Sequence, residues 1–322
     1  MCLLQHESTV LLIIFESILP VFLIVAFGVA LKNSRLISPE FWPHFNNFGF
    51  YVLFPGLIFH SIVTADFATL PVDQIMLASI LAFGSIPVLI LLLWPYFKRK
   101  NVSKPQFTSV FQTTTRWHGF MALAIAEKMF GNEGLTFVAV IMLVIILPIN
   151  FVNVAVMVAF DDTRHSLSSF VKKMFTNPII VAAIFAILFQ AFGIKLYPPI
   201  EQSIDFIARA SLGMGLLMIG AGLSIYMITH PNLLTIFAVC VKLLVLPVMA
   251  LIIGTFFDFT LTELTLFTIA CAVPTANNGY VLAQKMGGDA PLYASIASLQ
   301  VVVSFFTIPL VLLAMEKLHN WI

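Results

Sequence analysis

The chain has 322 residues, of which 60% are hydrophobic and only 10% are charged, and its formal net charge is +1. A soluble domain carries roughly 25% charged residues, so this composition leaves too little polar surface for a water-soluble protein. The net charge says nothing about nucleic acid, but the sequence lacks a basic run of the length that nucleic-acid binding needs. We therefore predict an integral membrane protein.

Apolar blocks of about the length that crosses a bilayer, roughly 20 residues, repeat along the whole chain. The first block follows MCLLQHESTV, which lacks the basic flank of a cleaved signal peptide, so we expect it to be retained. Polar residues, prolines and glycines separate the blocks. The blocks predict ten transmembrane helices, at about 11–31, 43–63, 75–97, 107–130, 135–160, 177–194, 201–228, 232–256, 264–285 and 290–315.

Lysines and arginines predict the orientation, because they favour cytoplasmic loops. The loops on the other side hold only Lys128, Lys195 and Lys317, with Arg209 just inside span seven, and most of the acidic residues. We therefore expect a multi-pass protein of the cell inner (plasma) membrane with both termini on the periplasmic side. The loops after spans one, three, five and nine hold ten basic residues, Lys32, Arg35, Lys98, Arg99, Lys100, Lys104, Arg164, Lys172, Lys173 and Lys285.

Two similar stretches, AEKMFG at 126–131 and AQKMGG at 283–288, predict an internal repeat. Each follows a glycine and an aromatic residue, and their start positions differ by 157 residues (283 minus 126), about half the chain. Because five spans are an odd number, the two halves are expected to be inverted repeats, a device of transporters. The expected divisions are a first five-helix repeat at 8–160, a cytoplasmic connector at 161–176 and a second five-helix repeat at 177–316.

Segments four and nine correspond in the two halves, and we expect both to be broken helices. Pro274 removes a backbone donor from segment nine, and the run Asn277-Asn278-Gly279 is a poor helix former. Segment four has no central proline, so its break rests on TTTRWHG, which ends at Gly119. Irregular backbone at membrane depth is tolerated only where it is buried in protein or lines a cavity, so the breaks predict a central site.

Arg116 and His118 are two basic side chains in segment four. A charge inside the membrane costs several kcal/mol and normally faces a partner or an aqueous cavity. Arg116 is expected to clamp a carboxylate, to snorkel to the cytoplasmic side or to bind free carbonyls of the broken helix. His118 is expected to donate to the substrate or to be a satisfied packing residue.

Thr275 and Asn278 can donate and accept hydrogen bonds at the second break, either to line the site or to satisfy the broken backbone. Asn277 is less favourably placed. Lys242 lies halfway along span eight, which contains no acid, so its expected partner is a carbonyl, a polar group of another span or the substrate. The glycines of LGMGLLMIGAGLS in span seven have the small-residue spacing that lets helices approach closely.

The sequence lacks the common motifs of enzymes. HExxH, a nucleotide-binding loop and GxSxG are absent from the sequence, and Asp205 is expected to pair with Arg209 one turn away. The three cysteines, Cys2, Cys240 and Cys271, have no metal-binding spacing. We therefore expect no catalytic residue, no metal and no cofactor.

Four stretches resemble the auxin efflux carrier family, the bacterial relatives of the plant carriers. They are ILPVFLIVAFGVALKNSRLISPEFWPHFNNFGFYVLFPGLIFHSI, TNPIIVAAIFAILFQAFGIKLYPPIEQSIDFIARASLGMGLLMIGAGLS, VKLLVLPVMAL and AVPTANNGYVLAQKMGGDAPLYAS. The resemblance covers nearly the whole chain. It implies an all-α polytopic membrane protein of the bile acid/arsenite/auxin-type transporter fold, with ten transmembrane helices in two inverted five-helix repeats and broken crossover helices four and nine.

The resemblance also implies secondary transport of small organic anions, such as malate, malonate and, in plants, indole-3-acetate. Pro274 and Asn278 match the family's crossover residues, and Lys242 matches a basic position common in span eight. Bacterial members often read Arg-Phe-Asn-Thr in span four, where this chain reads Arg-Trp-His-Gly from Arg116 to Gly119. The arginine is kept, and the side chains that would read the substrate differ.

We therefore predict a secondary transporter of mono- or dicarboxylates that works by alternating access. The alternative is a channel-like or sensor protein with the same fold and no transport cycle. The expected partners are the anion and the bilayer, the family makes a homodimer plausible, and coupling to a proton or to sodium stays open. Expected substrate-binding residues are Arg116, His118, Gly119, Thr275, Asn277, Asn278 and Lys242, and expected helix-break residues are Pro274 and Gly279.

Overall fold

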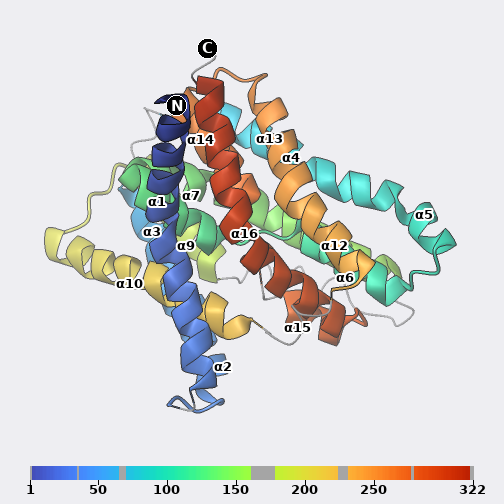
Figure 1. Ribbon diagram of the computed structural model, residues 1–322. Coiled ribbons are helices and arrows are strands. Elements are labelled where there is room, and N and C mark those ends of the chain that lie inside the picture. Colours follow the sequence, from blue (N-terminus) through green and yellow to red (C-terminus); the bar gives the residue numbers. More distant parts are fainter. Residues whose placement is uncertain are drawn as a thin grey trace.

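The computed structural model describes residues 2–34, 36–64, 70–160, 178–223, 231–276 and 279–319. Within these ranges every regular element is a helix, and Figure 1 shows that the start of α1 and the end of α16 lie at the same end of the molecule. The predicted connector at 161–176 and the predicted site residues Asn277 and Asn278 lie outside the described residues.

The helices of the described residues follow one another along the chain in two halves. The first half contains α1 (Cys2–Asn33), α2 (Phe41–Phe48), the π-helical turn η1 (Gly49–Leu53), α3 (Phe54–Val63), α4 (Val72–Leu92), α5 (Trp94–Arg99), α6 (Lys104–Thr115) and α7 (Gly119–Phe160). The second half contains α9 (Pro178–Ala191), α10 (Pro198–Gly222), α12 (Leu233–Cys240), the π-helical turn η3 (Val241–Val245), α13 (Leu246–Gly254), α14 (Leu261–Ala272), α15 (Gly279–Lys285) and α16 (Ala290–His319).

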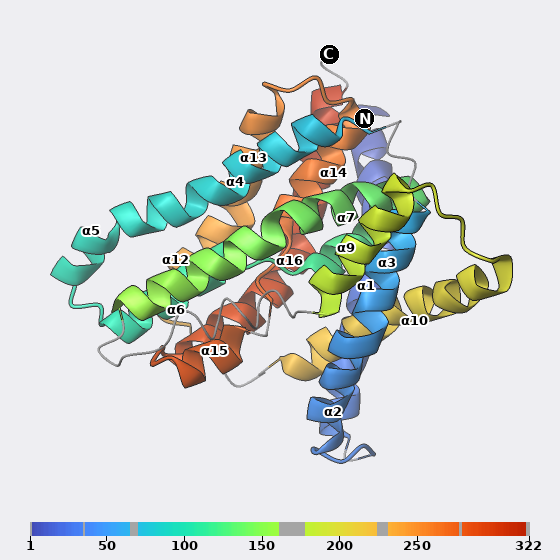
Figure 2. The same ribbon diagram turned by 180° about the vertical axis from the view of Figure 1, so that it is seen from behind.

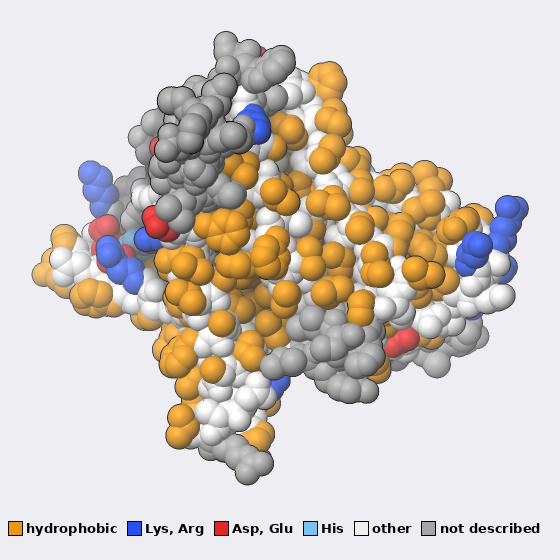
Figure 3. All heavy atoms as spheres, viewed as in Figure 1, with side chains coloured by type: hydrophobic (Ala, Val, Ile, Leu, Met, Phe, Trp, Pro, Cys, Tyr) orange, Lys and Arg blue, Asp and Glu red, His pale blue; other side chains and the backbone are white. Residues whose placement is uncertain are grey.

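Several helices have the length and the apolar composition of membrane-spanning helices. Shorter apolar helices cover Ile18–Asn33, Pro178–Ala191 and Leu261–Ala272. Figure 3 shows hydrophobic side chains over most of one face and lysines and arginines gathered at the edge formed by α5. The architecture is that of a polytopic membrane protein. Among the described residues, five helical stretches are long and apolar enough to cross a bilayer: Val72–Arg99, Lys104–Phe160, Pro198–Gly222, Leu233–Gly254 and Ala290–Met315.

Helix α7 contains the junction between predicted spans four and five. The helix is kinked at Gly131, whose φ of 60° lies in the left-handed region that glycine adopts without a steric penalty. The kink falls between the predicted end of span four and the predicted start of span five.

Glycines allow α1 and α10 to cross closely. A Cβ atom on Gly220 of α10 would collide with the carbonyl of Val25 and approach the Cα of Gly28 to 3.0 Å. This close approach is the packing expected for small residues in membrane helices. The prediction for the span-seven glycines is thus confirmed at Gly220, whereas a Cβ atom on Gly213 would meet nothing within 4 Å.

The contacts divide the helices into two groups. Helices α1, α3, α9 and α10 pack on one another, and α2 and η1 join them. Helices α4, α6, α7, α12, α13, α14 and α16 form the second group, with α15 packed on α16 and α6. The groups meet where α1 contacts α16 and where α1, α3 and α10 contact α7, as Figure 2 shows from behind. Both predicted broken segments belong to the second group.

Helices α6 and α14 begin with the same capping arrangement. Ser103 Oγ accepts a hydrogen bond from the Gln106 N–H, and the Gln106 side chain accepts one from the Ser103 N–H. Thr260 and Glu263 form the same reciprocal pair before α14. Each helix has 12 residues, and the two caps are 157 positions apart (260 minus 103). The S/T-x-x-E/Q signature of such a cap is a further sequence signal that marks where both helices start.

Candidate functional site

The first break separates α6 from α7. Arg116 ends α6 with an extended backbone, at φ −65° and ψ 156°, and the helix starts again at Gly119. The polar stretch TTTRWHG therefore breaks the helix as predicted, without a proline.

The second break separates α14 from α15. Val273 ends α14 with an extended backbone, at φ −75° and ψ 151°, the residues from Pro274 to Ala276 are not helical, and α15 begins at Gly279. The helical segment is thus interrupted at Pro274. The two helices that lead into the breaks thus end with the same backbone conformation.

The two breaks contact each other directly. The backbone N–H of His118 donates to the carbonyl of Pro274 at an N–O distance of 3.0 Å. The indole N–H of Trp117 donates to the carbonyl of Ala270, in the last turn of α14, at 2.6 Å. Helices α6 and α14 approach this junction from opposite sides of the molecule, as both ribbon views show. The segment that contains α6 and α7 therefore contacts the segment that contains α14 and α15 at the places where the two are interrupted.

Neutral amides hold Arg116, which is only 3% exposed. Its Nε donates to Oε1 of Gln112, one turn earlier on α6, and its Nη1 donates to Oδ1 of Asn150 on α7, both at 3.1 Å. The neighbouring Thr115 donates to Oδ1 of Asn153 at 2.9 Å. The guanidinium does not reach the protein surface, and its bonds join the end of α6 to α7. Two asparagines three positions apart in an apolar span are the signal that sequence reasoning missed.

His118 and Lys242 are buried, with exposed fractions of 6% and 0%. Among the described residues, Nδ1 of His118 and Nζ of Lys242 have no hydrogen-bond partner. Nζ of Lys242 lies 5.8 Å from the centroid of the Phe83 ring on α4, and Lys242 interacts electrostatically with His118 and with the thiol of Cys271. Lys242 lies in η3, and such π-helical turns are frequent at functional sites. The structure therefore places a second basic side chain beside the first break.

Gln300 of α16 connects the second break to two other helices. Its side-chain Oε1 accepts from the backbone N–H of Thr275 at 2.9 Å. Its Nε2 donates to the carbonyl of Thr113 on α6 at 3.1 Å and to that of Ala238 on α12 at 3.2 Å. Gln300 is fully buried, and it was not among the residues expected at the site. A glutamine in the middle of an apolar span is the signal that could have identified it.

Tyr293 of α16 supports the same break and packs against Gly279. Its hydroxyl donates to the carbonyl of Ala276 at 2.6 Å and lies 3.4 Å from Oγ1 of Thr275. A Cβ atom on Gly279 would overlap this hydroxyl. At the first break, a Cβ atom on Gly119 would lie 2.8 Å from the Trp117 ring. After each break the helix therefore starts again at a glycine that packs against an aromatic side chain.

The structure brings together most of the described residues that we expected at the site. Arg116, His118 and Gly119 form the first break, Pro274 and Thr275 form the second, and Gly279 opens α15. Lys242 lies in η3, which packs on α6 and α14, the helices that lead into the two breaks. No group of three potential metal ligands occurs in the part of the chain that the structure describes.

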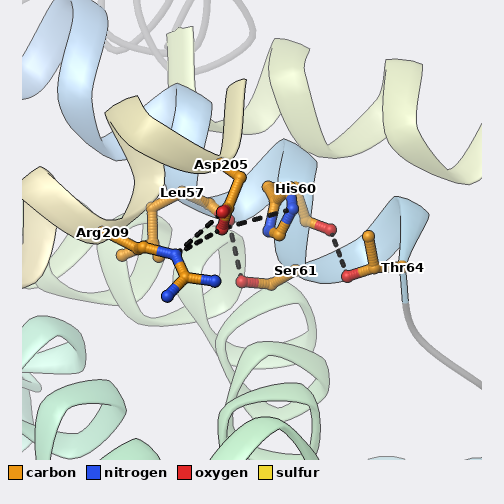
Figure 4. Close-up of polar contacts among 6 residues, drawn as sticks. All are labelled: Leu57, His60, Ser61, Thr64, Asp205 and Arg209. Atoms are coloured by element: carbon orange, nitrogen blue, oxygen red, sulfur yellow. Dashed lines mark hydrogen bonds and ion pairs between the residues drawn. The ribbon is translucent and has the colours of Figure 1, made fainter. Parts of the chain in front are cut away.

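A second polar region lies away from the crossing, in a cavity of about 500 Å³ between α3, α7 and α10. Figure 4 shows the Asp205 carboxylate between His60 and Arg209. The carboxylate accepts from Nε of Arg209 at 2.8 and 3.0 Å and lies 3.7 Å from Nε2 of His60. The predicted pair of Asp205 and Arg209 is confirmed. The cavity lining includes none of the described residues that we expected to bind substrate.

Comparisons with known proteins agree with this architecture. The model of the family described as "Membrane transport protein" matches residues 13–161 and 161–312. The chain is also similar to proteins named "Uncharacterized transporter YfdV" from Escherichia coli K12, Escherichia coli O157:H7 and Shigella flexneri. Each shares 20% identity over 299 residues, which cover 87% of this chain and 92% of the relative. The matches agree with the resemblance in the sequence, and the chain belongs to the membrane transport protein family, the family of the auxin efflux carriers.

Proposed function

We propose that the protein is a secondary transporter of small organic anions, mono- or dicarboxylates, with its site where the two broken helices meet. The observation that carries the proposal is the junction of the breaks, where the His118 N–H donates to the Pro274 carbonyl beside buried Arg116 and Lys242. Basic side chains deep in an apolar protein favour an anionic ligand. The N-terminus of α7, which begins at the junction, adds the positive end of a helix dipole.

Alternating access is part of the proposal. The two groups of helices support it, because both broken segments lie in the group formed by α4, α6, α7 and α12 to α16. We propose that this group moves against α1, α3, α9 and α10, so that the junction opens to one side of the membrane at a time. A site between inverted repeats is typical of such transporters.

We further propose ten spans in two inverted repeats, 8–160 and 177–316, with both termini on the periplasmic side of the inner membrane. Three features recur at the same offset of 157 residues: the capping boxes at 103 and 260, the extended helix ends at 116 and 273, and the stretches at 126 and 283. The opposite approach of α6 and α14 supports the inversion. The common end shared by the start of α1 and the end of α16 supports an even number of spans.

The test is uptake of labelled acetate, lactate, malonate and L-malate into liposomes that contain the purified protein. We expect uptake of at least one anion to saturate as its concentration rises, and we expect Arg116→Ala to lower that uptake about tenfold, because the junction loses its anchor and a positive charge. Arg209→Ala is the matched control, because this arginine side chain is 77% exposed and lies away from the junction.

Three outcomes would contradict the proposal in different ways. If no anion is taken up beyond the level in protein-free liposomes, a carboxylate carrier is the wrong function. If uptake rises linearly without a plateau, the channel-like alternative is favoured. If Arg116→Ala and Arg209→Ala both transport as the wild type does, the transport site does not depend on Arg116.

A further inference from the structure

We propose that Lys242 takes up a proton together with the transported anion, which couples transport to protons at this amine. The inference rests on the proposed function, because it assigns the coupling ion of the same site. It depends on three properties of Lys242: its enclosure, the groups that face it and the lack of a resident counter-ion among the described residues.

Lys242 is enclosed on all sides. Its side chain has no exposed surface, and the turn η3 that carries it packs on α6, α14 and α16. The Phe83 ring of α4 lies 5.8 Å from Nζ. No hydrogen-bond partner of Nζ occurs among the residues that the structure describes. Lysine is almost never fully buried unless it is paired. We therefore infer that the partner of this amine is a ligand that binds and dissociates.

The groups that face Lys242 do not supply a negative charge. Among the described residues, the titratable groups that interact with it are the His118 imidazole, at the first break, and the Cys271 thiol, on α14. The charged group at the end of α6 is Arg116, which repels an ammonium and is held by neutral amides. From α16, the buried polar groups near the break are the Gln300 amide, which bonds to three backbone groups, and the Tyr293 hydroxyl, which donates to the Ala276 carbonyl. An ammonium without a counter-charge in such a place is strongly destabilising.

An anion that enters the junction supplies the missing charge. The lone pair of the Lys242 amine accepts a proton from the aqueous side, and the ammonium then donates hydrogen bonds to the carboxylate, while no bond of the substrate forms or breaks. Because each partner stabilises the other, proton and anion favour each other's binding to the same extent. Both leave when the site opens on the other side. Arg116 cannot serve in this way, because a guanidinium does not lose its proton in proteins.

The experiment measures proton uptake on binding. Purified full-length protein in nanodiscs, in weak buffer with a pH-indicator dye, is titrated with acetate, lactate, malonate and L-malate. We expect binding of at least one anion to take up about one proton, and its affinity to fall up to about tenfold for each pH unit in the range where the amine loses its proton. Lys242→Arg keeps a permanent charge, so we expect it to bind the anion without proton uptake and with an affinity that does not change between about pH 6 and about pH 9.

Two further variants identify the group that takes up the proton. Lys242→Met should weaken binding at least about tenfold, and His118→Gln, titrated until the anion saturates it, should still take up about one proton for each anion bound, whatever its affinity. If the wild type binds an anion without taking up a proton, the coupling is wrong and the proposed carrier function still stands. The same holds if His118→Gln loses proton uptake while Lys242→Arg keeps it. Failure of all four anions to bind the wild type would overturn the proposed function itself. The wild-type and Lys242→Arg measurements decide the matter even if Lys242→Met does not fold.

Discussion

The two breaks have the same backbone geometry, and different residues support them. The first break has no proline, and its polar support comes from α6 and α7: Arg116 bonds to Gln112 and Asn150, and Thr115 bonds to Asn153. The second break contains Pro274, and its support comes from Gln300 and Tyr293 of α16. These supports of the first break therefore come from the two helices that flank it, whereas support for the second comes from the next helix, α16, which also contacts α6 and α12.

This difference shows how a broken helix can be satisfied where water is scarce. Backbone groups freed by a break need new partners, because each unpaired group costs several kcal/mol in the membrane. Proline removes one donor, and its carbonyl accepts the hydrogen bond of the His118 N–H in the other break. A backbone donor freed by the first break is thus satisfied by a backbone acceptor of the second. The comparison predicts that changes at the second break disturb the protein more, because its support joins more helices.

The largest effect is expected for Gln300→Leu. The variant removes hydrogen bonds to three backbone groups, and at about 1 kcal/mol each it should lower the free energy of unfolding by about 3 kcal/mol. The measurement is chemical denaturation of the purified protein in detergent. Gln202→Leu is the matched control, because this glutamine of α10 is exposed. Equal stabilities of the two variants would show that Gln300 does not hold the second break.

A smaller effect is expected for Gly279→Ala. The new methyl group would overlap the Tyr293 hydroxyl and displace it from the Ala276 carbonyl, and overpacking of this kind costs about 1–3 kcal/mol. The corresponding change at the first break, Gly119→Ala, should cost less, because the methyl group meets the Trp117 ring at Cζ3 and not at the indole nitrogen that donates to Ala270.

The same denaturation measurement tests this ranking, with Gly213→Ala as the control. A Cβ atom on Gly213 would meet nothing within 4 Å, and alanine favours a helix over glycine, so this variant should be as stable as the wild type or more stable. If Gly119→Ala is the more damaging of the two break variants, the second break is not the more tightly supported one.

Much of this arrangement can be predicted from the sequence. Pro274 marks one break, TTTRWHG marks the other, and the capping signatures at 103 and 260 locate the helices that lead into them. These signals are local, because they depend on the conformational preferences of neighbouring residues. The residues that support the breaks are different. Gln300 bonds to Thr113 and Ala238, which lie 187 and 62 positions away along the chain, and only the folded packing brings these groups together.

The roles of basic residues were harder to predict for the same reason. Arg116 was expected to bind either substrate or the helix break, and the amides of Gln112 and Asn150 now account for two of its donors. For Lys242 the sequence left several partners open, and the structure shows that Nζ has no hydrogen-bond partner among the described residues. Which basic group is paired depends on contacts between segments, and a linear pattern does not record them.

The smallest effect is expected at the first break, for Thr115→Val. Thr115 donates to Oδ1 of Asn153 on α7 at 2.9 Å, whereas its neighbour Thr114 bonds only to carbonyls of its own helix among the described contacts. Both side chains are buried, so Thr114→Val is a matched control with the same change of shape. Thr115→Val should be less stable by about 1 kcal/mol, because it leaves a buried amide oxygen without its donor. The value should lie below that of Gln300→Leu, since one bond is lost and not three. If the two threonine variants unfold at the same denaturant concentration, Asn153 does not support the first break, and the bond of Arg116 to Asn150 is the hydrogen bond that joins the end of α6 to α7 among the described side chains.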